Sequence, residues 1–269
     1  MPPKKKMPHA MVVSTAVLLL VAGGGLLAGG AAGKSAAAHE QSAEQNETGA
    51  KVFVTETWRI RRGGRIYGNW ADELDREAPK TTHPSYPKAG KKAGAETWRC
   101  KECHGWDYKG KDGAYGSGGH FTGIEGIDHM VGASVGIIEK ILRDDDHRYT
   151  KEMIPDKEIE NLAYFISWGQ IDMNDFIAPK TKKAAGNPRH GAEIFQTVCA
   201  VCHGLDGRLI NFGDEKSPEF VGTVGRENPW EMLHNIRFGH SGDAMIGLIA
   251  FPVRDQVDVL SYTQTLPDK

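Results

Sequence analysis

Apolar residues recur along most of the chain at the three- and four-residue spacing of helices with one buried face. The clearest stretch is 127–142, where apolar positions follow this spacing until the acidic run Asp144–Asp146 ends it. Three later segments show the same pattern and predict helices over 156–168, 229–238 and 254–265. Gly191–Phe195 predicts a further helix just before Cys199. The pattern therefore favours an all-α protein built of short helices.

The first 38 residues, 1–38, have the pattern of an export signal. Lys4–Lys6 are basic, residues 11–32 are apolar and uncharged, and Ala36–Ala38 offers the small residues of a cleavage site. Two interpretations stay open. The segment is a cleaved signal peptide, or it is a membrane anchor, because the apolar run is long enough to span a bilayer although its glycines dilute its hydrophobicity. Both interpretations translocate the rest of the chain.

Residues 39–89 form an N-terminal extension that is expected to be irregular or to contain a hairpin. Val52–Ile60 is rich in strand formers, and Gly63–Gly64 offers a turn before Arg65–Tyr67, so a short hairpin is predicted here. Residues 51–93 are also locally basic, through Arg59, Arg61, Arg62, Arg65, Lys80, Lys88, Lys91 and Lys92. These charges could form a solvated face, a docking patch for a partner protein, or pairs with an anionic cofactor group.

Two copies of one short motif use all four cysteines of the chain. Residues 100–104 and 199–203 both read C-x-x-C-H, the attachment sequence of c-type haem; the residues concerned are Cys100, Cys103, His104, Cys199, Cys202 and His203. Cysteines three residues apart lie about one helical turn from each other, so both thiols can reach one porphyrin. The histidine then supplies an axial nitrogen to the iron. A single copy could also be a zinc half-site or a thiol redox pair, but two copies favour two covalently bound haem c groups.

Composition and charge agree with a soluble protein that carries one haem in each of two domains. The chain has 269 residues, of which 39% are hydrophobic and 25% are charged, and its net charge is −2. Without residues 1–38 the charge is −6, since Lys4, Lys5, Lys6 and Lys34 are removed with no acidic residue. This acidic balance argues against a nucleic-acid-binding protein.

Each half of the chain resembles a class I c-type cytochrome domain, over residues 90–179 and 188–269. Several features recur in both halves: Gly94 precedes Trp98 as Gly191 precedes Phe195, and Cys-His-Gly recurs at 103–105 and 202–204. In this family a methionine in a later loop supplies the distal iron ligand, and the last helix crosses the first. The resemblance therefore implies two tandem helical cytochrome c domains. It also implies four axial ligands: His104, Met153, His203 and Met245.

The chain departs from the family pattern beside the first motif. The family places a proline there whose carbonyl orients the proximal histidine. Pro218 could serve the second motif, but residues 105–154 contain no proline, so a carbonyl within 122–126 is expected to orient His104. Histidines are the rival distal ligands: His120, His129 and His147 for the first haem, His234 and His240 for the second.

The resemblance implies a periplasmic dihaem electron carrier rather than an enzyme, with no catalytic residues. Two haems closed by histidine and methionine leave no open iron position for a substrate. Such a protein carries electrons between a dehydrogenase or quinol-oxidising complex and a terminal acceptor, so its partners are redox proteins. Residues 11–32 would anchor it to the inner membrane if they are not cleaved. Two alternatives are a haem-containing subunit of a respiratory or sulfur-oxidising complex and a dihaem peroxidase-type enzyme.

Overall fold

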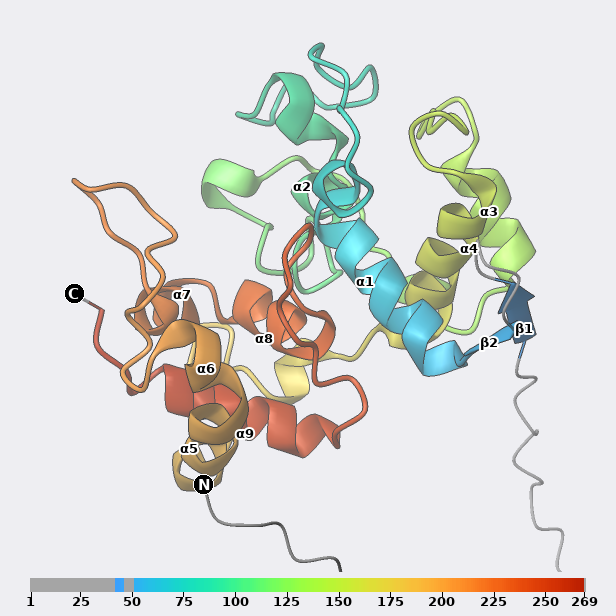
Figure 1. The fold of residues 1–269 in the computed structure, drawn as a ribbon. Helices are drawn as coiled ribbons and strands as arrows, with labels where there is room; N and C mark the ends of the chain where they lie inside the picture. Colours follow the sequence, from blue (N-terminus) through green and yellow to red (C-terminus); the bar gives the residue numbers. More distant parts are fainter. Residues whose placement is uncertain (1–41, 46–50, 269) are drawn as a thin grey trace, which may run out of the picture. The chain divides into compact units, whose positions relative to one another are not determined.

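The computed structural model describes residues 42–45 and 51–268, all of which belong to a compact unit formed by His39–Lys269 (Figure 1). The segment predicted to be a signal peptide or anchor, 1–38, lies outside the described residues. Within the described part of the chain, no helix is both long and apolar enough to cross a membrane.

Helices make up nearly all of the regular structure, as the hydrophobic pattern predicts for an all-α protein. The α-helices are α1 (Glu56–Glu73), α2 (Cys100–His104), α3 (Val135–Leu142), α4 (Asp156–Tyr164), α5 (Pro188–Ile194), α6 (Ala200–His203), α7 (Val221–Glu227), α8 (Pro229–Phe238) and α9 (Val253–Thr263). Short 3₁₀ and π-helical turns are η1 (Gly94–Trp98), η2 (Gly118–His120), η3 (Asp128–Met130), η4 (Phe165–Gly169), η5 (Met173–Asp175) and η6 (Phe195–Cys199). One antiparallel strand pair, β1 (Ser42–Gln45) with β2 (Lys51–Val54), precedes the helices.

The extension contains an antiparallel strand pair, β1 with β2, but the specific hairpin predicted with its turn at Gly63–Gly64 is wrong. After β2 the chain enters α1, which begins at Glu56 and is capped by Thr55, whose hydroxyl accepts a 3.1 Å hydrogen bond from the Trp58 N–H. The expected turn at Gly63–Gly64 lies inside this helix. Tyr67 and Trp70 are fully buried in the core, and this packing overrides the strand propensity of the segment.

Helices α1 and α4 cross at Gly63, which allows their backbones to approach closely. A Cβ atom at Gly63 would lie 2.1 Å from the carbonyl oxygen of Asn161 on α4. One turn further along each helix, the rings of Tyr67 and Phe165 pack with centroids 5.2 Å apart. In the first half of the protein, residues 56–179, a glycine contact followed by an aromatic pair therefore holds the first helix against α4.

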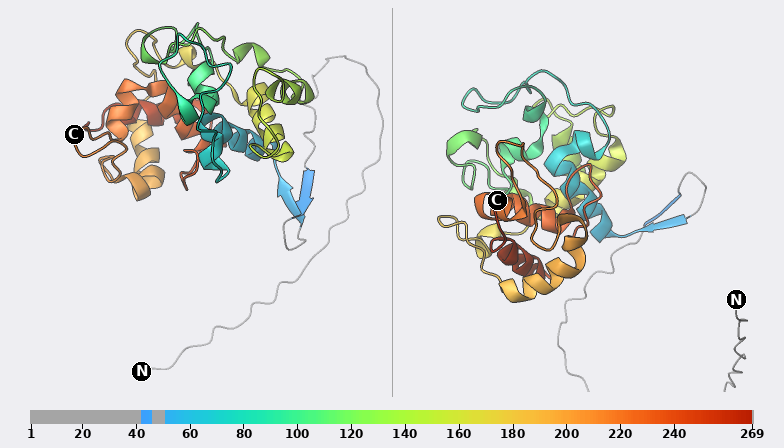
Figure 2. Two further views of the ribbon diagram at one scale, coloured as in Figure 1. Left: turned by 90° about the horizontal axis from the view of Figure 1, so that it is seen from above. Right: turned by 60° about the vertical axis from the view of Figure 1, so that its left-hand side comes forward.

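Helices α5 and α9 cross in the same way in the second half, residues 188–268. A Cβ atom at Gly191 would lie 1.9 Å from the carbonyl oxygen of Asp258, and the rings of Phe195 and Tyr262 have centroids 5.3 Å apart. The right-hand view of Figure 2 shows these helices side by side, in orange and dark red. The two crossings use the same spacing on every helix, because each aromatic residue lies four positions after the residue at the close contact.

This internal repeat corrects the sequence comparison between the two halves. Gly94 and Trp98 lie in the short turn η1 and do not form a helix crossing like that of Gly191 and Phe195. The counterpart of α5 in the first half is α1, with Gly63 and Tyr67 in the equivalent positions. Residues 74–99 are then an insertion between this helix and the first cysteine motif.

The described residues of the two halves share one buried core, with α1 in contact with both. Beside the Gly63 contact with α4, a Cβ atom at Gly64 would lie 2.4 Å from the Phe238 ring of α8. His234 of α8 hydrogen-bonds the carbonyl oxygen of Gly64 and the hydroxyl of Tyr108, both at 2.8 Å. The core residues form a single cluster drawn from both halves.

Candidate haem sites

The first motif forms the short helix α2, which ends at Gly105 with a positive φ of 78°. Cys100 and Cys103 are partly buried and are not joined in a disulfide. Burial raises the pKa of the Cys100 thiol to about 11 and that of the Cys103 thiol to about 12. Thiol redox pairs work through a lowered pKa, so this environment does not suit disulfide exchange chemistry.

His104 is held by a backbone carbonyl in the segment where the sequence predicts one. Its Nδ1–H donates a 2.7 Å hydrogen bond to the carbonyl oxygen of Glu125, which confirms the expectation of an acceptor within 122–126. Burial lowers the pKa of His104 to about 4, so the ring is neutral near pH 7. The lone pair of a neutral ring with a protonated Nδ1 is on Nε2, which is the state that a metal requires.

The loop 144–149 folds against this motif and places a second histidine beside His104. The rings of His104 and His147 have centroids 6.3 Å apart, and their planes differ by 20°. The Tyr149 hydroxyl lies 3.8 Å from the Cys100 sulfur and donates a 2.8 Å hydrogen bond to the carbonyl oxygen of Trp98. From the sequence, His147 is only one of three histidines that rival Met153 as the distal ligand.

The two other rival histidines of the first site have different surroundings. His120 stacks on Tyr115, with ring centroids 4.5 Å apart, and its Nδ1 lies 3.5 Å from a carboxylate oxygen of Glu102. His129 is exposed and close enough to His104 to contribute to the lowering of the pKa of that ring.

Met153, the expected distal ligand of the first haem, lies in the turn before α4. Its side chain is partly buried against the hydrophobic core. Its backbone N–H donates to the Thr150 hydroxyl at 3.3 Å, and its carbonyl oxygen lies 3.5 Å from a guanidinium nitrogen of Arg76. Whether its sulfur binds iron stays a prediction.

The second motif is more open than the first. Cys199 immediately precedes α6 and is partly buried, whereas Cys202 is exposed. Burial lowers the pKa of His203, so this ring is also neutral near pH 7. The Nδ1 of His203 is buried without a hydrogen-bond partner among the described residues, so the suggested carbonyl of Pro218 does not orient it.

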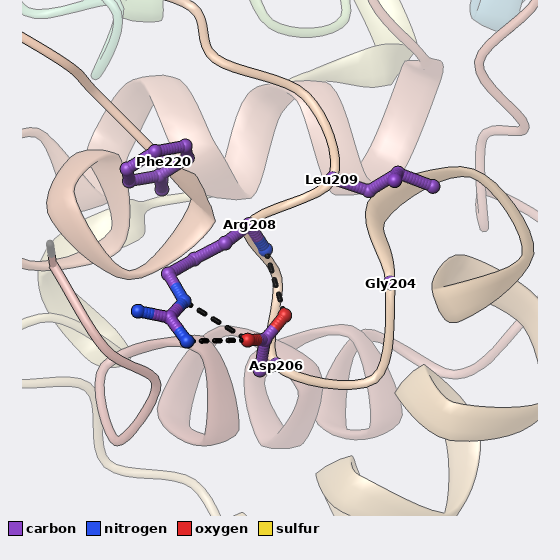
Figure 3. Close-up of a pocket in the computed structure, with 5 residues that line it drawn as sticks. All are labelled: Gly204, Asp206, Arg208, Leu209 and Phe220. Carbon is purple, nitrogen blue, oxygen red and sulfur yellow. Dashed lines mark hydrogen bonds and ion pairs between the residues drawn. The ribbon is translucent and has the colours of Figure 1, made fainter.

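A patch of exposed apolar side chains surrounds the second motif. Val201, Leu205 and Leu209 are 69–78% exposed, and the less exposed members are Ile210 and Phe212. Single exposed apolar residues are common, but five within 12 residues of sequence are typical of a surface that a ligand or a partner covers. A pocket of about 410 Å³ adjoins this patch, lined by Gly204, Asp206, Arg208, Leu209 and Phe220 (Figure 3). Asp206 and Arg208 form an ion pair of 2.8 Å at its edge.

The residues proposed to lie opposite His203 come from the loop after α8. The Met245 side chain is partly buried, and its carbonyl oxygen accepts hydrogen bonds from Arg61 at 3.1 Å and from Arg65 at 3.5 Å. His240 pairs with Asp243 at 2.7 Å. Both ring nitrogens of His234 are engaged inside the core, which removes this histidine from the set of rival ligands.

The arginines of the extension mostly form internal contacts. Arg65 pairs with Glu73 at 2.8 Å, and Arg62 pairs with Glu158 at 3.0 Å. Arg59 is buried and pairs with Glu160 at 3.0 Å. The prediction of a solvated face or docking patch is therefore wrong for these arginines, whose charges hold α1 against α4 and the loop after α8. Lys80, Lys88 and Lys91 remain exposed.

Among the described residues, the donor atoms of neither motif form a converging cluster. Within the described ranges, the only three groups of metal-binding type that converge are His190, Asp255 and Asp258. The two sulfurs and the imidazole of a motif do not meet at one point. They are adjacent in sequence, and in both motifs burial lowers the pKa of the histidine, so its ring is neutral near pH 7.

No family model matches the chain, and no curated protein matches it either.

Proposed function

We propose that the protein is an electron carrier with two covalently bound haem c groups, one at each C-x-x-C-H motif. The observation that carries this proposal is the repeat of one arrangement in both halves. In each half, two helices cross at a glycine, and a motif with two free cysteines and a neutral histidine lies between these helices in the sequence. Two such arrangements use every cysteine in the chain.

The chain's own residues would bind the cofactor and tune it. Cys100 and Cys103 would form thioethers to the first haem, and Cys199 and Cys202 to the second. His104 and His203 would each donate an axial nitrogen, with His104 oriented by its bond to Glu125. When bound, each haem supplies a one-electron couple at its iron. The exposed apolar side chains at Val201, Leu205 and Leu209 would cover the second porphyrin.

We favour electron transfer over catalysis because each iron would have two protein ligands and therefore no open position for a substrate. Met153 and Met245 are the sequence-based candidates for the distal positions. The pattern of residues 1–38 supports export to the periplasm, where c-type haem is attached in bacteria, with an inner-membrane anchor if the segment is retained. Donor and acceptor would both be redox proteins.

The test is the haem content of the purified full chain. Intact-protein mass and the spectrum of the alkaline pyridine complex should both give two haems per chain, and a thiol reagent should label no cysteine in denaturant. A chain with one haem or none, and with free thiols at either motif, would contradict the proposal. A Cys199→Ser/Cys202→Ser variant should retain one haem.

A further inference from the structure

We propose that His147 is the distal axial ligand of the first haem, opposite His104. This inference depends on the proposed function, because it requires a haem at the first motif. It changes the ligand pair of that haem from the histidine and methionine of the family pattern to two histidines.

The separation of the two rings matches that of a pair of imidazoles on one iron. Metal–nitrogen bonds of about 2 Å place two ring centroids about 6 Å apart, because each centroid lies about 1 Å behind its nitrogen. The centroids of His104 and His147 are 6.3 Å apart, with nearly parallel planes.

Both rings are held through Nδ1, which leaves Nε2 for a metal. His104 donates from Nδ1 to the Glu125 carbonyl, and His147 donates from Nδ1 to a carboxylate oxygen of Asp144 at 3.1 Å. Histidines that bind metals typically make this bond to a carbonyl or carboxylate through the other nitrogen, which fixes the tautomer and the ring direction.

The loop that carries His147 is preorganised by its own contacts. The Asp144 carboxylate also accepts from the backbone N–H groups of Asp146 and His147, at 3.0 and 2.9 Å. From the insertion 74–99, His83 donates a 2.9 Å hydrogen bond to the carbonyl oxygen of His147, and Ser85 donates one of 2.8 Å to that of Asp146. The insertion therefore fixes the backbone of the proposed ligand.

The internal repeat supports His147 independently of these contacts. In the second half, Met245 lies 13 residues before Asp258, the residue of α9 at the helix crossing. In the first half, His147 lies 14 residues before the equivalent Asn161, whereas Met153 lies only 8 residues before it. The position that corresponds to Met245 is thus next to His147.

The first part of the test uses two matched variants of the haem-loaded full chain, His147→Ala and Met153→Ala. His147→Ala should convert about half of the ferric iron from low spin to high spin, measured by electron paramagnetic resonance, and added imidazole should restore it. Met153→Ala should leave the spin state and both reduction potentials unchanged. Haem mass should remain two per chain in both variants.

The opposite pattern would overturn the inference. If Met153→Ala opens an iron and His147→Ala does not, methionine is the ligand. If neither variant changes the spin state, the two histidines make a ring contact only. If the wild-type chain carries no haem, the proposed function itself is refuted. This outcome is distinguishable from a wrong assignment of the distal ligand.

A measurement on the unaltered protein keeps the inference testable if a variant fails to fold. The sulfur-to-iron charge-transfer band of the oxidised wild type should have at most half the intensity per iron of a protein with only histidine–methionine haems. Full intensity per iron would require a methionine on both haems and would exclude His147.

Discussion

At the scale of single residues, the two proximal histidines have equivalent places in their motifs and different support. His104 donates to the Glu125 carbonyl, while the Nδ1 of His203 is buried without a described partner. A hydrogen bond to the second ring nitrogen raises the basicity of a histidine ligand and fixes its orientation. If each motif holds a haem as proposed, the protein would control the electronic properties of the first iron more directly than those of the second.

Met245 provides a prediction for the second haem. Replacement by alanine should lower the reduction potential of that haem, because a thioether sulfur favours ferrous iron. A potentiometric titration should show this shift together with the loss of the sulfur-to-iron band. Met153→Ala serves as the control, since the first haem is proposed to use His147. An unchanged band in Met245→Ala would contradict Met245 as the distal ligand and leave His240 as the next candidate.

At the scale of elements, α1 connects the predicted extension to the core. Two adjacent glycines of α1 pack against different helices: Gly63 contacts α4, and Gly64 contacts α8. A helix with small residues on two sides can approach two neighbours at once. Ile66, Tyr67 and Trp70 of the same helix are fully buried, and local propensity cannot anticipate this packing.

Gly63 provides a prediction for the stability of this element. Gly63→Ala should lower the free energy of unfolding by about 2–3 kcal/mol, because the added methyl group overlaps the Asn161 carbonyl. Urea unfolding of the haem-loaded protein measures the effect. Gly136→Ala is the matched control: this helical glycine has open space at its Cβ, so alanine should raise stability by about 0.5–1 kcal/mol. Equal effects of the two substitutions would contradict the crossing geometry.

Much of the helical framework could be predicted from the sequence. The helices at 156–168, 229–238 and 254–265 are present, with α4 continuing into η4. The carbonyl that orients His104 was also predictable, because the absence of proline in 105–154 required another acceptor. The segment 127–142 is helical mainly from Val135 onward, after the short turn η3.

The helix crossing at Gly63 and the position of His147 could not be predicted, because both depend on contacts between residues far apart in the chain. Gly63–Gly64 resembles a turn in the sequence, and only the packing of α4 and α8 shows that it is a crossing. One signal was present: Gly63 and Tyr67 have the four-residue spacing of Gly191 and Phe195. The position of His147 beside His104 depends on the insertion 74–99, whose hydrogen bonds have no periodic pattern.

At the scale of the whole described unit, buried polar groups join the two halves in addition to apolar packing. His234 is 1% exposed, with Nε2–H donating to Gly64 and Nδ1 accepting from Tyr108. Arg237 is also buried and donates to the carbonyl oxygen of Gly169 at 2.9 Å and to Gln256 at 3.1 Å. The two halves are therefore expected to unfold together.

His234 makes the stability of this unit dependent on pH. Burial lowers the pKa of His234 to about 3, whereas an unfolded chain has a histidine pKa of about 6.5. Below pH 6.5 the unfolded chain binds a proton that the folded protein does not, so stability falls by about 1.4 kcal/mol per pH unit until the folded pKa is reached. The difference in unfolding free energy between the wild type and His234→Gln, measured by urea titration from pH 7 to pH 5, should narrow as the pH falls. A constant difference would show that His234 has the same pKa in the folded and the unfolded protein, and would contradict its lowered pKa.

The unequal enclosure of the two motifs has a consequence for biogenesis. The machinery that joins haem to a cysteine must reach both thiols of a motif. At the first motif the insertion 74–99 and the loop 144–149 close over the site, with Tyr149 against Cys100. At the second motif Cys202 is exposed. If each motif holds a haem as proposed, haem insertion at the first motif would have to precede the closure of that loop, while the second motif would remain accessible afterwards.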